Sequence, residues 1–344
     1  MKPLAEAERV PSIEVLRGIA LLGVLLVNLL TGFRVPLAGH ILGVDEPLGP
    51  GGSILLSLVS ALIEFKAFTL FSFLFGVGVA IQAQRAAGPN IAQFFLRRFG
   101  ALTALGLIHL LFVWNGDILT LYGICGLILI PLLRLPLAAL TGLGALLIAA
   151  PHIAPLPVHF PDNATLHELA AGASHAYRTA GWYELFAFRW RETEVVVAPL
   201  LLLSAPRTLG LMLWGVAAWR RGLFEGRKSL WRGILIAGTT VGLASLVLRN
   251  PQIATLPVAF AYAAAILLWN PRAPLLAAGG RMAFTNYLLQ SIIFGFVFYS
   301  YGLGWFGGLG VGITLAGGLV FYFVQLMWSR WWLRRFYFGP FEWL

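Results

Sequence analysis

Long runs of apolar residues, separated by short polar or Pro/Gly-containing stretches, divide the chain into segments of similar length. A helix needs about 20 mainly apolar residues to cross the hydrocarbon core of a bilayer. Pro206 is expected to break the sixth segment, because proline removes a hydrogen bond from a helix interior. The pattern predicts ten transmembrane helices, over residues 13–34, 55–84, 93–115, 117–134, 136–151, 193–219, 230–248, 253–270, 282–301 and 308–329.

The composition agrees with this pattern. Of the 344 residues, 59% are hydrophobic and 11% are Asp, Glu, Lys or Arg, whereas soluble proteins carry about 25% charged residues. So few charges exclude a soluble globule, and the apolar content excludes a disordered chain. The single cysteine, Cys125, excludes a disulfide-stapled fold. We predict an all-α polytopic membrane protein with one transmembrane domain over residues 1–344.

The net charge of +10 comes from basic residues that lie between the apolar runs. If the N-terminus is cytoplasmic, sixteen Lys and Arg residues fall in cytoplasmic segments and five in outer segments. Since cytoplasmic loops carry the excess of Lys and Arg, we expect both termini inside and no nucleic acid partner. Residues 152–192 would then form an outer loop, with an interfacial helix over 164–188. The sixteen residues are Lys2, Arg9, Arg85, Arg97, Arg98, Arg134, Arg220, Arg221, Arg227, Lys228, Arg232, Arg272, Arg281, Arg330, Arg334 and Arg335.

Two predicted helices repeat one polar spacing. Arg17 precedes Asn28 by eleven residues, and Arg98 precedes His109 by eleven. Eleven residues make about three helical turns, or about 16 Å, so each pair shares a face. If the two helices are neighbours, these side chains would line a polar seam through the membrane. Alternatively, the arginines anchor the topology, while Asn28 and His109 form interhelical hydrogen bonds.

Other polar residues within the predicted spans are candidates because ionisable groups in a membrane are costly. Glu64 stands near Lys66 in the second span, where an ion pair is the structural alternative. Arg207 follows Pro206. Asn286 and Gln290 share a helix face, on which two amides could bond either a neighbouring helix or a polar substrate. The outer-loop histidines fit no common zinc spacing, and we expect no metal.

Four sequence blocks resemble the bacterial YeiB-like family, long catalogued as a domain of unknown function. Together they cover nearly the whole chain, in order. They are Leu16 to Asn28 (LRGIALLGVLLVN), Lys66 to Gly78 (KAFTLFSFLFGVG), Gly106 to His109 with Gly116, Asp117 and Tyr122, and Gly280 to Gln290 with Phe338 to Trp343.

This family is similar to transmembrane acyltransferases, which include the lysosomal enzyme that acetylates heparan-sulfate glucosamine and bacterial enzymes that acylate surface sugars. The resemblance implies a cytoplasmic acyl-CoA donor, such as acetyl-CoA, and an outer hydroxyl or amine acceptor on a sugar or envelope molecule. His109 would be the general base, Asn28 an oxyanion donor, and Asp117 a partner of the imidazole or the acceptor. Arg17, Arg97, Arg98 and Arg281 would bind the phosphates of the donor. From their polar positions within the spans, Arg207, Asn286 and Gln290 are candidates for substrate contact, and Glu64 is an alternative catalytic residue.

Two other functions fit the same pattern. A transporter or channel of the bacterial inner membrane would also use ten spans, a mid-membrane arginine and a broken helix. A non-catalytic membrane partner of a biosynthetic pathway would not need a polar face at matching depth on two helices. A homo-oligomer is compatible with each of these functions.

Overall fold

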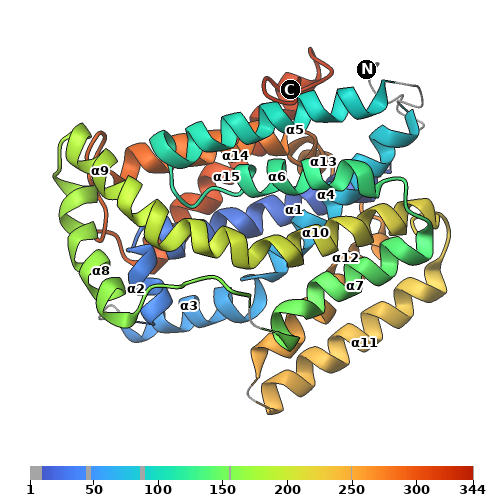
Figure 1. Cartoon of the computed structure of the whole chain (residues 1–344), viewed down its shortest axis with the longest axis horizontal. Helices are drawn as coiled ribbons and strands as arrows, with labels where there is room; N and C mark the ends of the chain where they lie inside the picture. Colours follow the sequence, from blue (N-terminus) through green and yellow to red (C-terminus); the bar gives the residue numbers. More distant parts are fainter. Residues whose placement is uncertain (1–9, 44–47, 86–89, 155, 249, 344) are drawn as a thin grey trace.

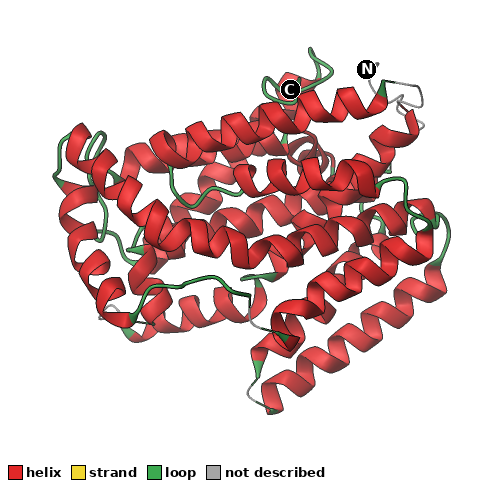
Figure 2. Ribbon diagram, in the orientation of Figure 1, coloured by secondary structure: helices red, strands yellow, loops and turns green. Residues whose placement is uncertain are grey.

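The computed structural model describes residues 10–43, 48–85, 90–154, 156–248 and 250–343, which form helices and loops without a strand (Figure 2). Most helices run along one direction, which is horizontal in Figure 1, and α2, α8 and α9 gather at the left end. The α-helices are α1 (Pro11–Asn28), α2 (Leu37–Leu42), α3 (Pro50–Leu62), α4 (Lys66–Arg85), α5 (Ile91–Ile108), α6 (Leu119–Leu132), α7 (Leu137–Ile153), α8 (Asn163–Arg178), α9 (Trp182–Glu192), α10 (Ala198–Arg220), α11 (Lys228–Val247), α12 (Thr255–Trp269), α13 (Pro274–Arg281), α14 (Ala283–Phe298) and α15 (Val311–Leu333). Three π-helical stretches, η2 (Leu29–Phe33), η3 (His109–Val113) and η4 (Thr193–Val197), and a 3-10 turn, η5 (Pro251–Ala254), join or extend them.

Each of the ten predicted segments coincides with helical structure, which confirms the all-α, multi-pass class. Six helical stretches of the described residues are long and apolar enough to cross a bilayer, and four apolar helices are shorter. The number of spans and their direction stay predictions. The long stretches are Pro11–Phe33, Gly51–Arg85, Ile91–Val113, Trp182–Arg220, Lys228–Val247 and Val311–Leu333, and the shorter helices are Leu119–Leu132, Leu137–Ile153, Thr255–Trp269 and Ala283–Phe298.

The prediction of one uninterrupted helix over 55–84 is wrong, because α3 and α4 are separated by a turn at residues 63–65. Phe65 adopts a left-handed φ of 59° there. Two polar side chains satisfy groups near the end of α3: Ser60 Oγ donates to Glu64 at 2.6 Å, and Lys66 Nζ donates to the Ser60 carbonyl at 3.4 Å. The charged residues that the sequence places within a helix therefore stabilise a break between two helices.

The structure also changes two other boundaries. Pro206 lies inside a continuous α10 and does not break it. The irregular backbone lies earlier, at η4, where α9 continues into α10 through a π-helical turn. The predicted helix over 164–188 consists of two helices, α8 and α9, which meet near residue 180.

Close helix packing at α5 and α6 positions the candidate site. These helices form a tightly packed pair, and Gly106 of α5 lies against the first turn of α6. A Cβ atom at Gly106 would lie 2.3 Å from the backbone nitrogen of Thr120. Glycine thus lets the end of α5, with His109, approach the start of α6.

Candidate functional site

A buried histidine–aspartate pair lies where α5 gives way to η3. Nδ1 of His109 lies 2.9 Å from Oδ1 of Asp117, an ion-pair contact that lacks the angle of a regular hydrogen bond. The exposed fractions of the two side chains are 2% and 0%. π-helical turns are rare and often occur at functional sites. Both the π-helical backbone at His109 and the buried carboxylate of Asp117 therefore mark this position as a candidate functional site.

The backbone at the start of α6 holds the carboxylate of Asp117. Its Oδ1 accepts the N–H of Leu119 at 3.0 Å, and its Oδ2 accepts the N–H of Thr120 at 2.7 Å. These are free N–H groups of a helix N-terminus, where negative charge is favoured. Asp117 therefore has a structural role as a helix cap, and the same contacts fix the carboxylate against His109.

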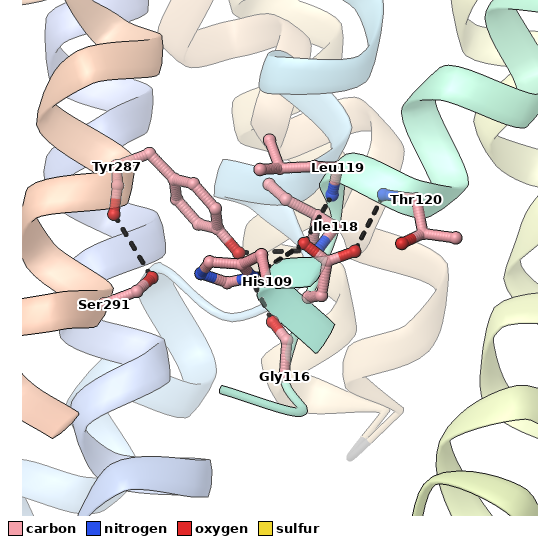
Figure 3. A network of polar contacts seen from close by, with 8 residues as sticks. His109, Gly116, Ile118, Leu119, Thr120, Tyr287 and Ser291 are labelled. Atoms are coloured by element: carbon pink, nitrogen blue, oxygen red, sulfur yellow. Dashed lines mark hydrogen bonds and ion pairs between the residues drawn. The ribbon is translucent and has the colours of Figure 1, made fainter. Parts of the chain in front are cut away.

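The second imidazole nitrogen of His109, Nε2, has no hydrogen-bond partner among the described residues. The ring lies beside α14, with its centroid 5.5 Å from that of Tyr287 (Figure 3). The Tyr287 hydroxyl lies 3.4 Å from both the Ile118 nitrogen and the Gly116 carbonyl oxygen. A carboxylate at Nδ1 favours the tautomer that carries its proton there, which leaves Nε2 as a proton acceptor.

A cavity of about 190 Å³ leads toward this pair from a cluster of arginines. Arg17, Arg98 and Arg281 contribute to its lining, and so do Ile118 and Tyr287 beside the histidine–aspartate pair. Its other walls include apolar side chains of α4 and α5, namely Phe71, Leu74, Phe75, Phe99 and Leu102. The cavity thus joins a cationic region to the surroundings of a buried base.

The arginines come from separate helices around this cavity. α1 and α5 do not pack side by side, so the condition for the predicted polar seam is not met. Of its four residues, Arg17 and Arg98 line the cavity, and Asn28 and His109 do not. Arg17 donates to the Leu74 carbonyl at 3.3 Å, and a Cβ at Gly78 would lie 2.6 Å from Nη2 of Arg17. Arg281 donates to the Tyr337 carbonyl at 3.3 Å.

The segment near the C-terminus brings a carboxylate to the same cavity. Glu342 contributes to the lining, and its Oε1 accepts the N–H of Thr285 at 3.0 Å, while the Thr285 hydroxyl donates to Oε2. Burial raises the pKa of the Glu342 carboxyl above its ordinary value, and the bonds from Thr285 oppose that shift. An acidic group therefore faces the arginines.

His109 and Asp117 lie beside this cavity without lining it, and three further candidates from the sequence are also absent from its lining. Arg97 is exposed and does not line it, although its neighbour Arg98 does. Asn28 is half-buried at the end of α1 and is absent from the lining. Glu64 is paired with His40, whose Nε2 lies 3.3 Å from Oε1, in a separate group of polar residues.

The three candidate substrate contacts bond to other helices. Arg207 of α10 donates to Thr69 of α4 at 2.9 Å. Asn286 Nδ2 donates to the Ser329 hydroxyl of α15 at 2.9 Å, and Gln290 Nε2 donates to Gln325 of α15 at 2.9 Å. For Asn286 and Gln290, the structure thus shows the bonding between neighbouring helices that was one of the two alternatives.

A second buried cluster, formed by Arg189, Glu192 and Tyr177, bonds to the segment between His109 and Asp117. The sequence did not reveal it. Arg189 donates to the Phe112 carbonyl at 3.0 Å. Glu192 accepts hydrogen bonds from Asn115 at 2.5 Å and from Tyr177 at 2.7 Å. The sequence placed residues 189 and 192 in an outer loop. The signal that could have found them is the group of four charged residues at 189–194, which precedes an apolar run.

Comparison with known proteins places the chain among relatives without an assigned function. Residues 218–344 match a family described as a protein of unknown function (DUF418). An uncharacterised protein of Bacillus subtilis (strain 168), YxaH, is 30% identical over 389 residues, covering 100% of this chain and 95% of that protein. Uncharacterised YeiB of Escherichia coli (strain K12) is 30% identical over 388 residues, covering 98% and 95%. This similarity along the whole chain shows that the protein belongs to the YeiB-like family of uncharacterised bacterial proteins.

Proposed function

We propose that this protein is a membrane-embedded acyltransferase, which moves an acyl group from a coenzyme A thioester to a hydroxyl or amine. The observation that carries the proposal is the cavity that leads from Arg17, Arg98 and Arg281 to the surroundings of the buried His109–Asp117 pair. The proposed donor is acetyl-CoA or another acyl-CoA from the cytoplasm. The proposed acceptor is a sugar or another envelope molecule on the opposite side of the bacterial inner membrane.

The arginines that line the cavity match the phosphate groups of such a donor. Guanidinium groups bind phosphates through paired, charge-assisted hydrogen bonds, so Arg17, Arg98 and Arg281 suit the phosphates of coenzyme A. A volume of about 190 Å³ is below the range of sites that enclose a whole drug-sized ligand. It fits the narrow thioester arm, with the nucleotide remaining at the mouth.

His109 is the proposed general base because Nε2 has no partner and Nδ1 faces a carboxylate. Nε2 would take the proton of the acceptor O–H or N–H while the acceptor oxygen or nitrogen bonds to the thioester carbonyl carbon. The C–S bond then breaks, and the proton passes from His109 to the departing sulfur. General bases of this kind typically contribute about 10²–10⁴-fold in rate.

Tyr287 replaces Asn28 in this proposal as the group that contacts the developing oxyanion. Its hydroxyl lies next to His109, and its two backbone contacts are long, at 3.4 Å each. A hydroxyl in such weak bonds can turn to donate to a new acceptor. Tyr287 both lines the cavity and contacts the His109 ring, whereas Asn28 does not line it, so the proposed step uses Tyr287.

The test uses the purified full chain in lipid nanodiscs with acetyl-CoA and a bacterial envelope extract as acceptor. Release of free coenzyme A is followed with a thiol reagent, and the one cysteine of the chain is buried and adds little background. We expect release that depends on the extract and falls about 10²–10⁴-fold in His109→Ala.

The control for this test is His159→Ala, which removes an exposed histidine of the outer loop and should leave release unchanged. Equal release by the wild type and His109→Ala would contradict the proposed base. If neither coenzyme A binding nor release is seen, and His109→Ala changes the flux of a solute instead, the protein is a transporter.

A further inference from the structure

We propose that this protein holds one anionic phospholipid at the end of the bundle where α6 and α10 finish, with the phosphate among three arginines and one acyl chain in an adjacent apolar slot. The inference is independent of the proposed acyl transfer, because these two cavities lie apart from the His109–Asp117 pair and share no lining residue with its cavity.

The first cavity has a volume of about 910 Å³. It lies among the ends of α4, α6 and α10 and the start of α5. Arg134, Arg220 and Arg221 contribute to its lining, with Trp219 and the single carboxylate Glu225. Arg220 donates to the carbonyls of residues 133 and 135, where α6 ends. This cavity is referred to below as the arginine cavity.

The arginine cavity carries more positive than negative charge, with three arginines and one carboxylate in its lining. In the part of the chain that the structure describes, no carboxylate lies within ion-pair distance of Arg134, Arg220 or Arg221. Three guanidinium groups around one space favour a bound anion, and the planar guanidinium group matches phosphate through paired hydrogen bonds. The end of the bundle that carries them is also the one that the basic residues predict to be cytoplasmic.

The second cavity, about 560 Å³ in volume, is almost entirely apolar. Its walls include aromatic residues of four helices, namely Phe73, Trp214, Trp231 and Phe260. α11 packs on α12 and η5 but makes no extensive contact with α7 or α10, so the slot lies between these helices. In Figure 1, α11 and α7 lie at the lower right edge of the bundle. This cavity is the apolar slot.

Arg221 joins the two cavities, because it lines both the arginine cavity and the apolar slot. A ligand that fills both therefore carries an anionic group and a hydrocarbon chain in the same molecule, close to each other. Basic pockets between transmembrane helices on the cytoplasmic side are a recognised setting for anionic lipid headgroups. Trp219 and Trp231 stand near the junction, where indole rings suit the boundary between headgroup and chain. A phospholipid of the surrounding leaflet meets these requirements.

The experiment is native mass spectrometry of the full chain, titrated with phosphatidylglycerol or with phosphatidylcholine of the same acyl chains. We expect phosphatidylglycerol to bind more tightly, and the double variant Arg134→Ala, Arg221→Ala to weaken it by about 30-fold. Arg227→Ala removes an exposed arginine near the start of α11 that lines neither cavity. This control should bind phosphatidylglycerol as the wild type does.

A second variant tests the apolar slot separately from the charge. Ala237 lines the slot, so Ala237→Trp should fill it and weaken binding of phosphatidylglycerol and phosphatidylcholine alike. Ile236→Trp, on an exposed face of the same helix outside the slot, is the matched control and should change neither. Thermal unfolding of each variant in nanodiscs checks that the fold is retained.

Four outcomes would overturn the proposal. The first is equal binding of the two lipids by the wild type, and the second is unchanged phosphatidylglycerol binding in both test variants. The third is tighter binding of a polyprenyl phosphate than of phosphatidylglycerol, which would assign the site to a different lipid. The fourth is displacement of the lipid by inorganic phosphate alone, which would show that the slot holds no chain.

Discussion

Nδ1 of His109 and Oδ1 of Asp117 lie 2.9 Å apart in a buried pair, while the same carboxylate accepts two backbone N–H groups from the first turn of α6. The aspartate is therefore fixed by main-chain atoms, independently of the histidine. A histidine that packs against a fixed carboxylate has a defined tautomer, and its second nitrogen is free to act on a ligand.

The charge of the aspartate can be removed while part of its cap is kept. Asp117→Asn keeps one side-chain oxygen, which can accept one of the two N–H groups that Oδ1 and Oδ2 accept in the wild type. It removes the charge that orients His109, so we expect thiol release to fall about 10²–10⁴-fold, with a loss of stability of about 1–3 kcal/mol from the second N–H group. Asp162→Asn is the matched control, because Asp162 caps α8 by the same kind of bond to Thr165. Equal effects of the two changes on release would contradict an orienting role.

Two neighbouring arginines of α5 provide a matched pair of variants. Comparing them distinguishes a specific contact with coenzyme A from a general effect of positive charge on its binding. Arg98 lines the cavity, whereas Arg97 is exposed and does not. We expect Arg98→Ala to weaken binding of coenzyme A by about tenfold or more, because a charge-assisted bond contributes about 1.5–3 kcal/mol. Arg97→Ala should change the affinity by less than about twofold. Titration calorimetry in nanodiscs measures both, and undiminished binding by Arg98→Ala would exclude this site for the phosphates.

The carboxylate of Glu342 makes the affinity for coenzyme A depend on pH. It lines the cavity that Arg98 lines, so its negative charge should oppose a phosphate there. Since burial raises the pKa of Glu342, the group takes up its proton at a higher pH than an ordinary glutamate. Wild-type affinity should therefore rise by about fivefold as the pH falls through that raised pKa.

Glu342→Gln is neutral at every pH and can still accept the N–H of Thr285. It should bind coenzyme A more tightly than the wild type at neutral pH, and the difference should vanish at low pH. Glu225→Gln, which lines the arginine cavity instead, is the control and should follow the wild type. Parallel pH profiles for the wild type and Glu342→Gln would show that this carboxylate does not face the ligand.

Two glycines of α5 test whether helix contact positions the site. A Cβ at Gly106 would lie 2.3 Å from the Thr120 nitrogen, whereas a Cβ at Gly100 meets no atom within 4 Å. We expect Gly106→Ala to destabilise the protein by about 1–3 kcal/mol, because backbone atoms must move apart. Gly100→Ala should be neutral or stabilising by up to about 1 kcal/mol. Unfolding midpoints in nanodiscs measure the difference, and a stable Gly106→Ala would show that the helices can separate without cost.

Cysteine labelling of intact cells tests the predicted direction of insertion. Asn163→Cys, at the start of α8, should react with a maleimide that cannot cross the membrane, whereas Lys228→Cys, at the start of α11, should react after lysis. Both positions are exposed, and the native Cys125 is buried. The prediction follows from the excess of basic residues on the side of Lys228. Labelling of Lys228→Cys in intact cells would contradict the predicted orientation and indicate the opposite one.

The helical class and the approximate place of each apolar segment followed from the sequence, because a membrane requires long apolar runs whose backbone bonds are closed within a helix. The spacing of Arg98 and His109 also placed both on one helix, since helical periodicity is a local property. The resemblance to known families implied that Asp117 is a partner of the imidazole or of the acceptor, and the structure places it beside the imidazole of His109.

Contacts between distant segments decided the rest. The sequence could not show that Arg98 faces the cavity while Arg97 does not, nor that Asn28 lies outside it. It also could not place Glu342, 244 residues after Arg98 in the numbering, in the same cavity. The turn at 63–65 depends on bonds of Ser60, and the continuity of α10 through Pro206 likewise ran against the local signal. These features depend on which helices pack together, and that choice is a balance of burial and polar pairing over the whole chain, which no local pattern encodes.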